Sequence, residues 1–104
     1  TPHALARVLG ESLSEPKPQV WFQAGGTLGA AGVQLDQRTR MMYDARHIFI
    51  NGESFVAAGT DARLMRQLAD QRSLSAVQLR RLSAGAAELL AEWVAAGWAH
   101  GVAA

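Results

Sequence analysis

The alternation of apolar and polar residues around one Asn-Gly pair predicts a β-hairpin centred on Asn51 and Gly52. Both central residues of a two-residue type I′ turn need a positive φ angle, which asparagine and glycine adopt most readily. The expected cross-strand pairs are Ile50 with Glu53, Phe49 with Ser54, Ile48 with Phe55 and His47 with Val56. Side chains alternate across a strand, so Ile48, Ile50 and Phe55 share one face. An isolated hairpin is marginal in water, so we expect the helices further along the chain to cover that face.

Residues 1–15 show helical periodicity and predict an amphipathic helix. Thr1 and Pro2 suit its first positions, and Pro16 ends it. Four apolar residues fall on one side of it: Leu5, Val8, Leu9 and Leu13. A helix this short is marginal alone, so this side must pack on something. Two alternatives stay open, namely packing within this domain and contact with an upstream domain or a second subunit.

Between this helix and the hairpin, short apolar runs separated by turn residues predict an antiparallel sheet. The expected strands cover residues 19–23, 32–36 and 41–43. The glycine-rich segment 24–32 is interpreted as a surface loop, because it lacks the G-x-x-x-x-G-K-[ST] pattern of a phosphate-binding loop.

After Gly59 the apolar period changes from two to 3.6, which predicts helices. The first helix is capped by Gly59 or Thr60 and runs to about Gln71. The second follows a capping box of Ser75 and Gln78 and runs to about Leu82. The third starts at Ser83 and ends near Gly97. Their inner stripes are Leu64, Met65, Leu68 and Ala69, then Ala86, Leu89, Leu90, Trp93 and Val94. Residues 98–100 form a terminal strand or an extended tail.

Three helices with tight turns beside a hairpin predict an α+β fold of winged-helix type. We expect residues 1–18 to form an N-terminal helix with a proline-containing linker, and residues 19–104 to form the winged-helix-like C-terminal domain.

Composition narrows the function classes. The 104 residues suffice for one small domain, and a net charge of +1 gives no strong field for nucleic acid or an anionic membrane. The absence of cysteine excludes disulfides and thiolate metal sites. No apolar run approaches the roughly 18–20 residues of a membrane span, and no signal peptide is present, so we expect a cytoplasmic protein. The chain begins Thr-Pro-His without methionine, and we expect a piece of a longer protein.

The residues that could carry chemistry do not form a catalytic or metal-binding pattern. His3, His47 and His100 lie outside any H-x-D or H-E-x-x-H spacing, and Asp44 near His47 has no third ligand in view. We therefore expect His47 to hydrogen-bond locally at the base of the hairpin. The serines lack a G-x-S-x-G context. We predict no catalytic, cofactor-binding or metal-binding residue in this chain.

Nucleic-acid binding by a winged helix depends on the charge of the helix that would enter the major groove. On the third helix the outer positions carry Glu88, Glu92 and several alanines. The two carboxylates would repel the phosphates of a nucleic acid. A modest basic edge could come only from Arg63, Arg66, Arg72, Arg80 and Arg81. A nucleic-acid-binding winged-helix regulatory domain is therefore kept as the alternative function.

Several strings of the chain carry a family resemblance. They are Leu9-Gly10-Glu11, Glu15-Pro16-Lys17-Pro18, Trp21-Phe22, Met41-Met42-Tyr43-Asp44, His47 through Phe55, Asp61 through Asp70, and Trp93 through Trp98. Together they span nearly the whole chain, and F-I-N-G-E-S-F is fairly specific. The chain resembles the C-terminal region of the bacterial cupin-4, JmjC-type ribosomal oxygenases.

The resemblance implies a parent that uses Fe(II) and 2-oxoglutarate to hydroxylate an arginine of a large-subunit ribosomal protein. Such proteins combine a JmjC barrel with an H-x-D…H iron site, a helical dimerisation region and a C-terminal winged helix. This chain lacks that triad and that barrel, so no iron or 2-oxoglutarate residue carries over. The expected role is a non-catalytic accessory domain for architecture, dimer support or substrate presentation. The implied partners are the upstream JmjC domain and a ribosomal protein bound by the parent. A separate alternative is a stand-alone scaffold that forms a homodimer through residues 1–15.

Overall fold

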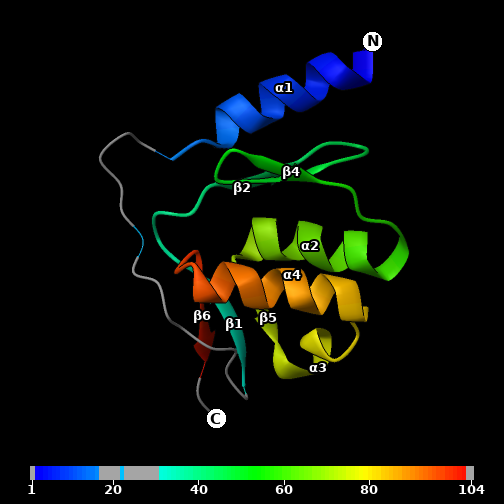
Figure 1. Cartoon of the computed structure of the whole chain (residues 1–104). Helices are drawn as coiled ribbons and strands as arrows, with labels where there is room; N and C mark the ends of the chain where they lie inside the picture. The colour runs from blue at the N-terminus through cyan, green and yellow to red at the C-terminus, as the bar shows by residue number, and fades with distance from the viewer. Residues whose placement is uncertain (1, 17–21, 23–30, 103–104) are drawn as a thin grey trace.

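The computed structural model describes residues 2–16, 22 and 31–102, and its fold is α+β (Figure 1). The elements in chain order are α1 (Pro2–Ser14), β1 (Gly32–Leu35), β2 (Met41–Tyr43), β3 (Ile48–Ile50), β4 (Glu53–Phe55), α2 (Gly59–Gln71), β5 (Ser73–Ser75), α3 (Ala76–Leu79), α4 (Ala84–Ala95) and β6 (Ala99–Val102). The predicted strand 19–23 and most of the glycine-rich segment 24–32 lie outside the described residues. No helix among the described residues is long and apolar enough to cross a lipid bilayer.

The predicted hairpin forms with the predicted register. Ile48 pairs with Phe55 and Ile50 with Glu53, and β2 joins the other side of β3 to make a three-stranded antiparallel sheet. Asn51 and Gly52 have φ angles of 47° and 89°, as a type I′ turn requires. Figure 1 shows α1 on one face of this sheet and the helices α2 and α4 beyond the other face.

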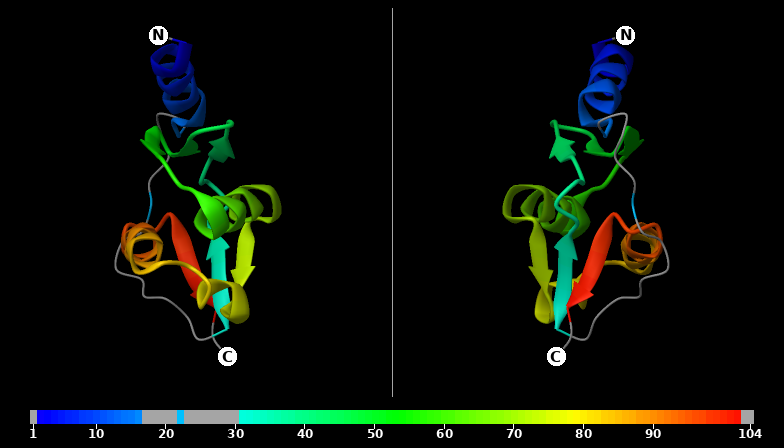
Figure 2. Two further views of the ribbon diagram at one scale, coloured as in Figure 1. Left: turned by 90° about the vertical axis from the view of Figure 1, so that its right-hand side faces the viewer. Right: turned by 90° about the vertical axis from the view of Figure 1, so that its left-hand side faces the viewer.

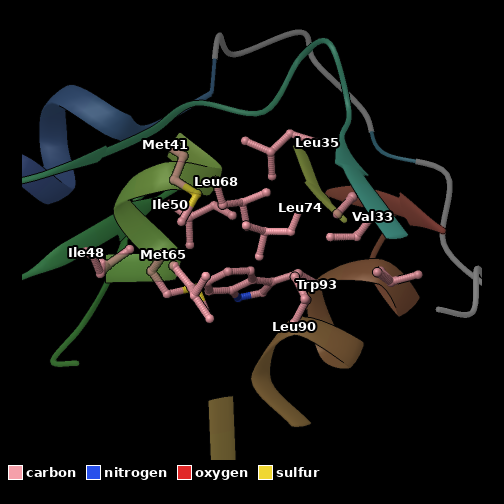
Figure 3. Packing of buried hydrophobic residues seen from close by; sticks show 13 residues of the cluster. Val33, Leu35, Met41, Ile48, Ile50, Met65, Leu68, Leu74, Leu90 and Trp93 are labelled. Atoms are coloured by element: carbon pink, nitrogen blue, oxygen red, sulfur yellow. The ribbon is translucent and has the colours of Figure 1, made fainter. Parts of the chain in front are cut away.

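The hydrophobic core lies on the α2 and α4 side of the three-stranded sheet (Figure 3). Its members come from α2, α4 and the strands β1, β2, β3, β5 and β6. They are Val33, Leu35, Met41, Ile48, Ile50, Leu64, Met65, Leu68, Leu74, Leu90, Trp93, Val94 and Ala99. The expectation that downstream helices cover Ile48 and Ile50 is therefore confirmed. Both inner stripes face this core, with Ala69, Ala86 and Leu89 packed partly buried against it.

The helix boundaries follow the capping signals, with two corrections. Ser75 and Gln78 form the predicted capping box, and Ser83 caps α4 by accepting a hydrogen bond from the Ala86 amide at 3.2 Å. The predicted cap of α2 at Gly59 or Thr60 is wrong, because Ala58 is the cap residue and supplies no side-chain hydrogen bond. Helix α3 is also shorter than predicted, since it ends at Leu79 and a turn follows.

Two backbone hydrogen bonds close the C-terminal end of α4 just before the last strand. Ala96 is the cap residue, and Gly97 follows it with a φ of 84°. The amides of Gly97 and Trp98 bond to the carbonyls of Val94 and Trp93, which is the Schellman arrangement. The chain then enters β6, so the terminal strand predicted at residues 98–100 is confirmed.

A second set of strands completes the winged helix. Strands β1 and β6 pair antiparallel, Gly32 opposite Val102. Strand β5 lies along the other side of β1, where the Leu35 amide donates to the Arg72 carbonyl at 2.8 Å (Figure 2). The strand that lies in the middle, β1, thus comes first in sequence. Strand β5 was not predicted.

Candidate functional site

Helix α1 contacts the hairpin through a residue without a side chain. Gly10 is buried against the ring of Phe49, and a Cβ at that position would lie 2.3 Å from the ring. The ring of Phe49, only 2% exposed, is thus covered by helix backbone on the face opposite the core. This close approach fixes which side of α1 faces the domain.

Polar side chains hold α1 in this position. The fully buried hydroxyl of Ser14 accepts a hydrogen bond from the Gly52 amide at 3.1 Å and donates to the Glu11 carbonyl at 3.1 Å. The Ser54 hydroxyl donates to the carboxylate of Glu11. This bond holds the pKa of Glu11 below its ordinary value. The α1 residues in these contacts, Gly10, Glu11 and Ser14, are therefore small or polar.

The apolar stripe of α1 is exposed, although α1 packs on the three-stranded sheet. The exposed fractions are 72% for Leu5, 62% for Val8, 58% for Leu9 and 57% for Leu13. Beside it, a groove of about 250 Å³ runs between Leu9 and Leu13 on α1 and Met42 on β2. Of the two alternatives for this stripe, packing within the domain is therefore wrong for the described residues. Exposed apolar surface of this extent on a helix is typical of an interaction site.

In the order of the elements, α4 follows α3 after a short turn and so takes the place that a recognition helix has in a helix-turn-helix. Its outer face carries Glu88 and Glu92, both exposed, and the sequence of α4 contains no lysine or arginine. A carboxylate surface repels the phosphates that any groove-binding helix must approach. The predicted solvated face of Glu88 and Glu92 is confirmed.

Of the five arginines considered for a basic edge, two are directed toward other parts of the domain, and three are exposed. Arg63 is exposed, while the guanidinium of Arg66 lies over the ring of Tyr43 at 5.8 Å. Arg80 and Arg81 are exposed on the turn after α3. Arg72 adopts the left-handed conformation at the end of α2, and its guanidinium turns inward. The expectation that Arg72 could join a surface edge is therefore wrong.

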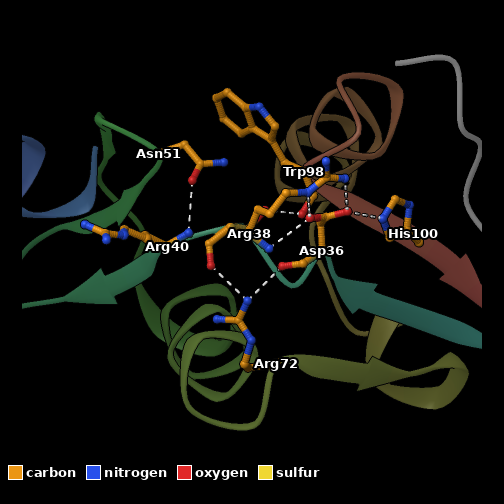
Figure 4. A network of polar contacts seen from close by, with 8 residues as sticks. Asp36, Arg38, Arg40, Asn51, Arg72, Trp98 and His100 are labelled. Atoms are coloured by element: carbon orange, nitrogen blue, oxygen red, sulfur yellow. Dashed lines mark hydrogen bonds and ion pairs between the residues drawn. The ribbon is translucent and has the colours of Figure 1, made fainter. Parts of the chain in front are cut away.

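Arg72 belongs to an internal polar junction that joins the two sheets (Figure 4). Its Nη2 atom donates to the carbonyls of Asp36 and Thr39, each at 2.8 Å. The Thr39 hydroxyl donates to the Trp98 carbonyl at 2.6 Å. The turn between β1 and β2 is thereby tied to the end of α2 and to the start of β6.

The carboxylate of Asp36, 6% exposed, is the charged centre of this junction. It accepts hydrogen bonds from the Arg38 amide at 2.9 Å and from the Arg38 guanidinium at 2.8 and 3.0 Å, and His100 Nε2 lies 2.7 Å away. The Arg38 guanidinium above all holds the pKa of Asp36 far below its ordinary value. Asp36 was not singled out from the sequence; an Asp at the start of a polar turn was the available signal.

The three histidines belong to three different segments of the chain, namely α1, the turn before β3, and β6. His47 Nδ1 lies 3.3 Å from Asp44 Oδ1, which confirms the expected local interaction at the base of the hairpin. His100 faces Asp36, and His3 is exposed on α1. Within the described residues no three His, Cys, Asp or Glu side chains gather closely enough to hold a metal ion. These residues do not fit an iron site of two histidines and a carboxylate.

The serines likewise have structural partners. Ser75 and Ser83 are helix caps, as predicted, and both oxygens of Asp61 accept hydrogen bonds from Ser83 at 2.9 and 2.6 Å. The roles of Ser14 and Ser54 in holding α1 were missed, because neither lies in a local motif. The surfaces that remain for function are the exposed stripe of α1 and the region around α4.

Comparisons with known proteins agree with this architecture. A family model described as the ROXA-like winged helix matches residues 1–100. Among solved structures, the X-ray structure of E. coli ycfD superposes with a TM-score of 0.78 at 14% sequence identity, which shows a shared fold. The superposition covers 95% of this chain and 30% of that one. No curated protein matches the chain. Since the family model covers nearly all of the sequence, the chain belongs to the ROXA-like winged helix family.

Proposed function

We propose that this domain is a non-catalytic accessory module of a larger protein that resembles the Fe(II)- and 2-oxoglutarate-dependent ribosomal protein arginine hydroxylases. It serves the architecture of that protein, supports its dimer or presents its substrate. The observation that carries the proposal is the unpartnered apolar stripe of α1, held outward by Gly10 and Ser14. A helix that is attached by its polar side and exposed on its apolar side can bind another protein surface through the apolar side.

Iron and 2-oxoglutarate belong, on this proposal, to a part of the parent outside this chain. The described residues do not fit the iron site, since no three His, Cys, Asp or Glu side chains among them gather closely enough to hold a metal ion. The ribosomal protein substrate reaches the parent's active site there, and the reaction takes place in the cytoplasm. The chain's similarity to less than a third of ycfD is in keeping with such a division.

A second copy of the chain is the proposed occupant of the α1 stripe. Leu5, Leu9 and Leu13 recur every four residues, and two such stripes can pack against each other about a twofold axis. Analytical ultracentrifugation over a range of concentrations should show a monomer–dimer equilibrium. A double variant, Leu5→Ser with Leu9→Ser, should remain monomeric. The control Ser12→Ala, on the same helix, should show the same monomer–dimer equilibrium as the unmodified chain. A monomer at every concentration would contradict the dimer proposal.

Nucleic-acid binding is the competing function and has its own test. A fluorescence polarisation titration at low salt with duplex DNA and with RNA should give no saturable binding, because α4 carries Glu88 and Glu92. Tight binding that weakens steeply with salt would replace the accessory role by a regulatory one.

A further inference from the structure

A second hollow, separate from the α1 stripe, opens between the hairpin, α2 and α4. Its volume is about 410 Å³, near the lower end for sites that hold a ligand or an anchoring side chain. The lining is mostly apolar and includes Phe55, Val56, Met65, Gly85, Leu89 and Trp93, and Asp61 is its charged member. Val56 on its rim is 76% exposed. The hollow therefore has the size and the chemistry to hold one large apolar side chain.

The floor of the hollow contains an unsatisfied donor. Trp93 is 2% exposed, and its ring extends from α4 toward Met65 (Figure 3). The ring lies 5.7 Å from that of Phe55, centroid to centroid. The indole N–H has no acceptor among the described residues. A buried donor without a partner costs free energy in the folded chain.

The charged groups around the hollow are acidic. Asp61 lies in the lining, and its pKa is lowered by the hydrogen bonds from Ser83, so it is ionised at neutral pH. Glu88 and Glu92 do not line the hollow, but both are exposed on α4, one residue before Leu89 and three residues after it. Neither basic residue of α2 lines the hollow: Arg63 is exposed, and the Arg66 guanidinium lies over the ring of Tyr43. The surface around the opening therefore favours a positively charged partner.

We propose that this hollow binds a basic polypeptide segment, which inserts one large apolar side chain between α2 and α4 and places lysine or arginine residues beside Glu88 and Glu92. The acidic rim excludes nucleic acid and anionic lipid as occupants, because their phosphates would be repelled. The inference rests on the proposed protein-facing role of the domain. It concerns a different surface from the α1 stripe, so each can fail while the other holds.

The test is a polarisation titration of the full chain with a fluorescein-labelled peptide, Lys-Arg-Leu-Arg-Lys. Two control peptides are Lys-Arg-Ser-Arg-Lys, with equal charge and no apolar anchor, and Glu-Asp-Leu-Asp-Glu, with the anchor and opposite charge. The serine peptide should bind at least about tenfold more weakly, since burial of a leucine side chain is lost. The acidic peptide should not bind. Equal binding of the leucine and serine peptides would overturn the proposal.

Variants of the chain place the binding in the hollow. A Cβ added at Gly85 meets no atom within 4 Å, so Gly85→Phe can fill the hollow without a clash at its first atom. This variant should lose at least about tenfold in affinity for the leucine peptide. Glu88→Gln with Glu92→Gln should weaken binding about two- to fivefold, and Glu15→Gln on α1 should leave it unchanged. Thermal unfolding checks that each variant is folded.

The peptide comparison needs no variant, so the proposal remains testable if Gly85→Phe does not fold. Leucine-peptide binding that is unaffected by Gly85→Phe in a folded chain would place the site elsewhere and overturn the proposal. Preference for duplex DNA over the leucine peptide would overturn it as well. Discrimination between the leucine and serine peptides, together with loss on Gly85→Phe, is the expected result.

Discussion

Helices α1 and α4 both carry an apolar stripe, yet only one stripe is buried. Leu90, Trp93 and Val94 on α4 are at most 2% exposed, whereas Leu9 on α1 is 58% exposed. Helix α4 packs into the core by its stripe, while α1 packs on the hairpin by Gly10 and the small polar residues around it. An apolar stripe therefore identifies the side of a helix that is to be buried, and does not identify the chain that buries it.

The largest expected effect contrasts these two stripes directly. Leu90→Ala should lower the free energy of unfolding by about 2–5 kcal/mol, because it removes a fully buried side chain and leaves a cavity. Leu9→Ala, the same substitution at an exposed site, should change the unfolding free energy of the monomer by less than about 0.5 kcal/mol. Urea unfolding at a concentration where the chain is monomeric measures both. Similar losses would mean that α1 has a partner within the monomer.

A change on the other side of α1 should detach the helix. Gly10→Val brings a side chain into the ring of Phe49 and should destabilise the attachment by about 1–3 kcal/mol. Hydrogen exchange read by mass spectrometry should then show faster exchange in α1 and unchanged protection in α4. Gly85→Ala in α4 is the matched control, since its added Cβ has free space. Protection lost equally in both helices would show that the two regions unfold together.

The polar junction between the two sheets should respond to acid. The pKa of Asp36 is lower in the folded chain than the unfolded value near 3.9, so its contribution is complete above that value and is lost as the pH falls below it. Asp36→Asn should cost about 1–2 kcal/mol at neutral pH. The stability difference between the two chains should stay constant from about pH 7 to 5 and shrink below about pH 4. Urea unfolding at several pH values measures this difference, and a pH-independent difference would rule out an ionic role for Asp36.

The smallest effect concerns a cap within the winged helix. Ser83→Ala removes the side-chain bond to the Ala86 amide and the hydroxyl bond to Asp61, and should cost about 1 kcal/mol. Ser12→Ala, at an exposed position of α1, serves as the control. Chemical denaturation gives the free energy of unfolding of both variants, and Ser83→Ala should be the less stable one. Equal stability of the two variants would contradict the capping role of Ser83.

Features set by neighbouring residues were predicted from the sequence. The Asn51-Gly52 turn, the capping box of Ser75 and Gln78 and the cap at Ser83 each depend on two to four adjacent residues. Local chemistry of this kind determines turn types and helix starts with little help from the rest of the fold. The inner stripes of α2 and α4 follow for the same reason, since helical periodicity alone places their apolar residues on one side.

Features that depend on distant residues were not predictable in this way. Strand β5 is three residues long and gains its extended form beside β1, and Arg72 turns inward only because the turn at Asp36 offers carbonyl acceptors. The contact between Gly10 and Phe49 joins residues that no periodicity relates. The exposed stripe of α1 and the hollow beside Trp93 belong to this group, so the candidate surfaces emerged from the structure.

The pairing of β1 with β6 has a consequence for the order in which the domain can form. Gly32 pairs with Val102, so β1 can complete its ladder with β6 only when the last described residue of the chain is in place. Closing so long a loop is entropically costly and slow compared with forming the hairpin or α4. During synthesis on the ribosome, the hairpin and helices can form early while β1 keeps an unpaired edge. We therefore expect the winged helix to close in a late, cooperative step once Val102 has emerged.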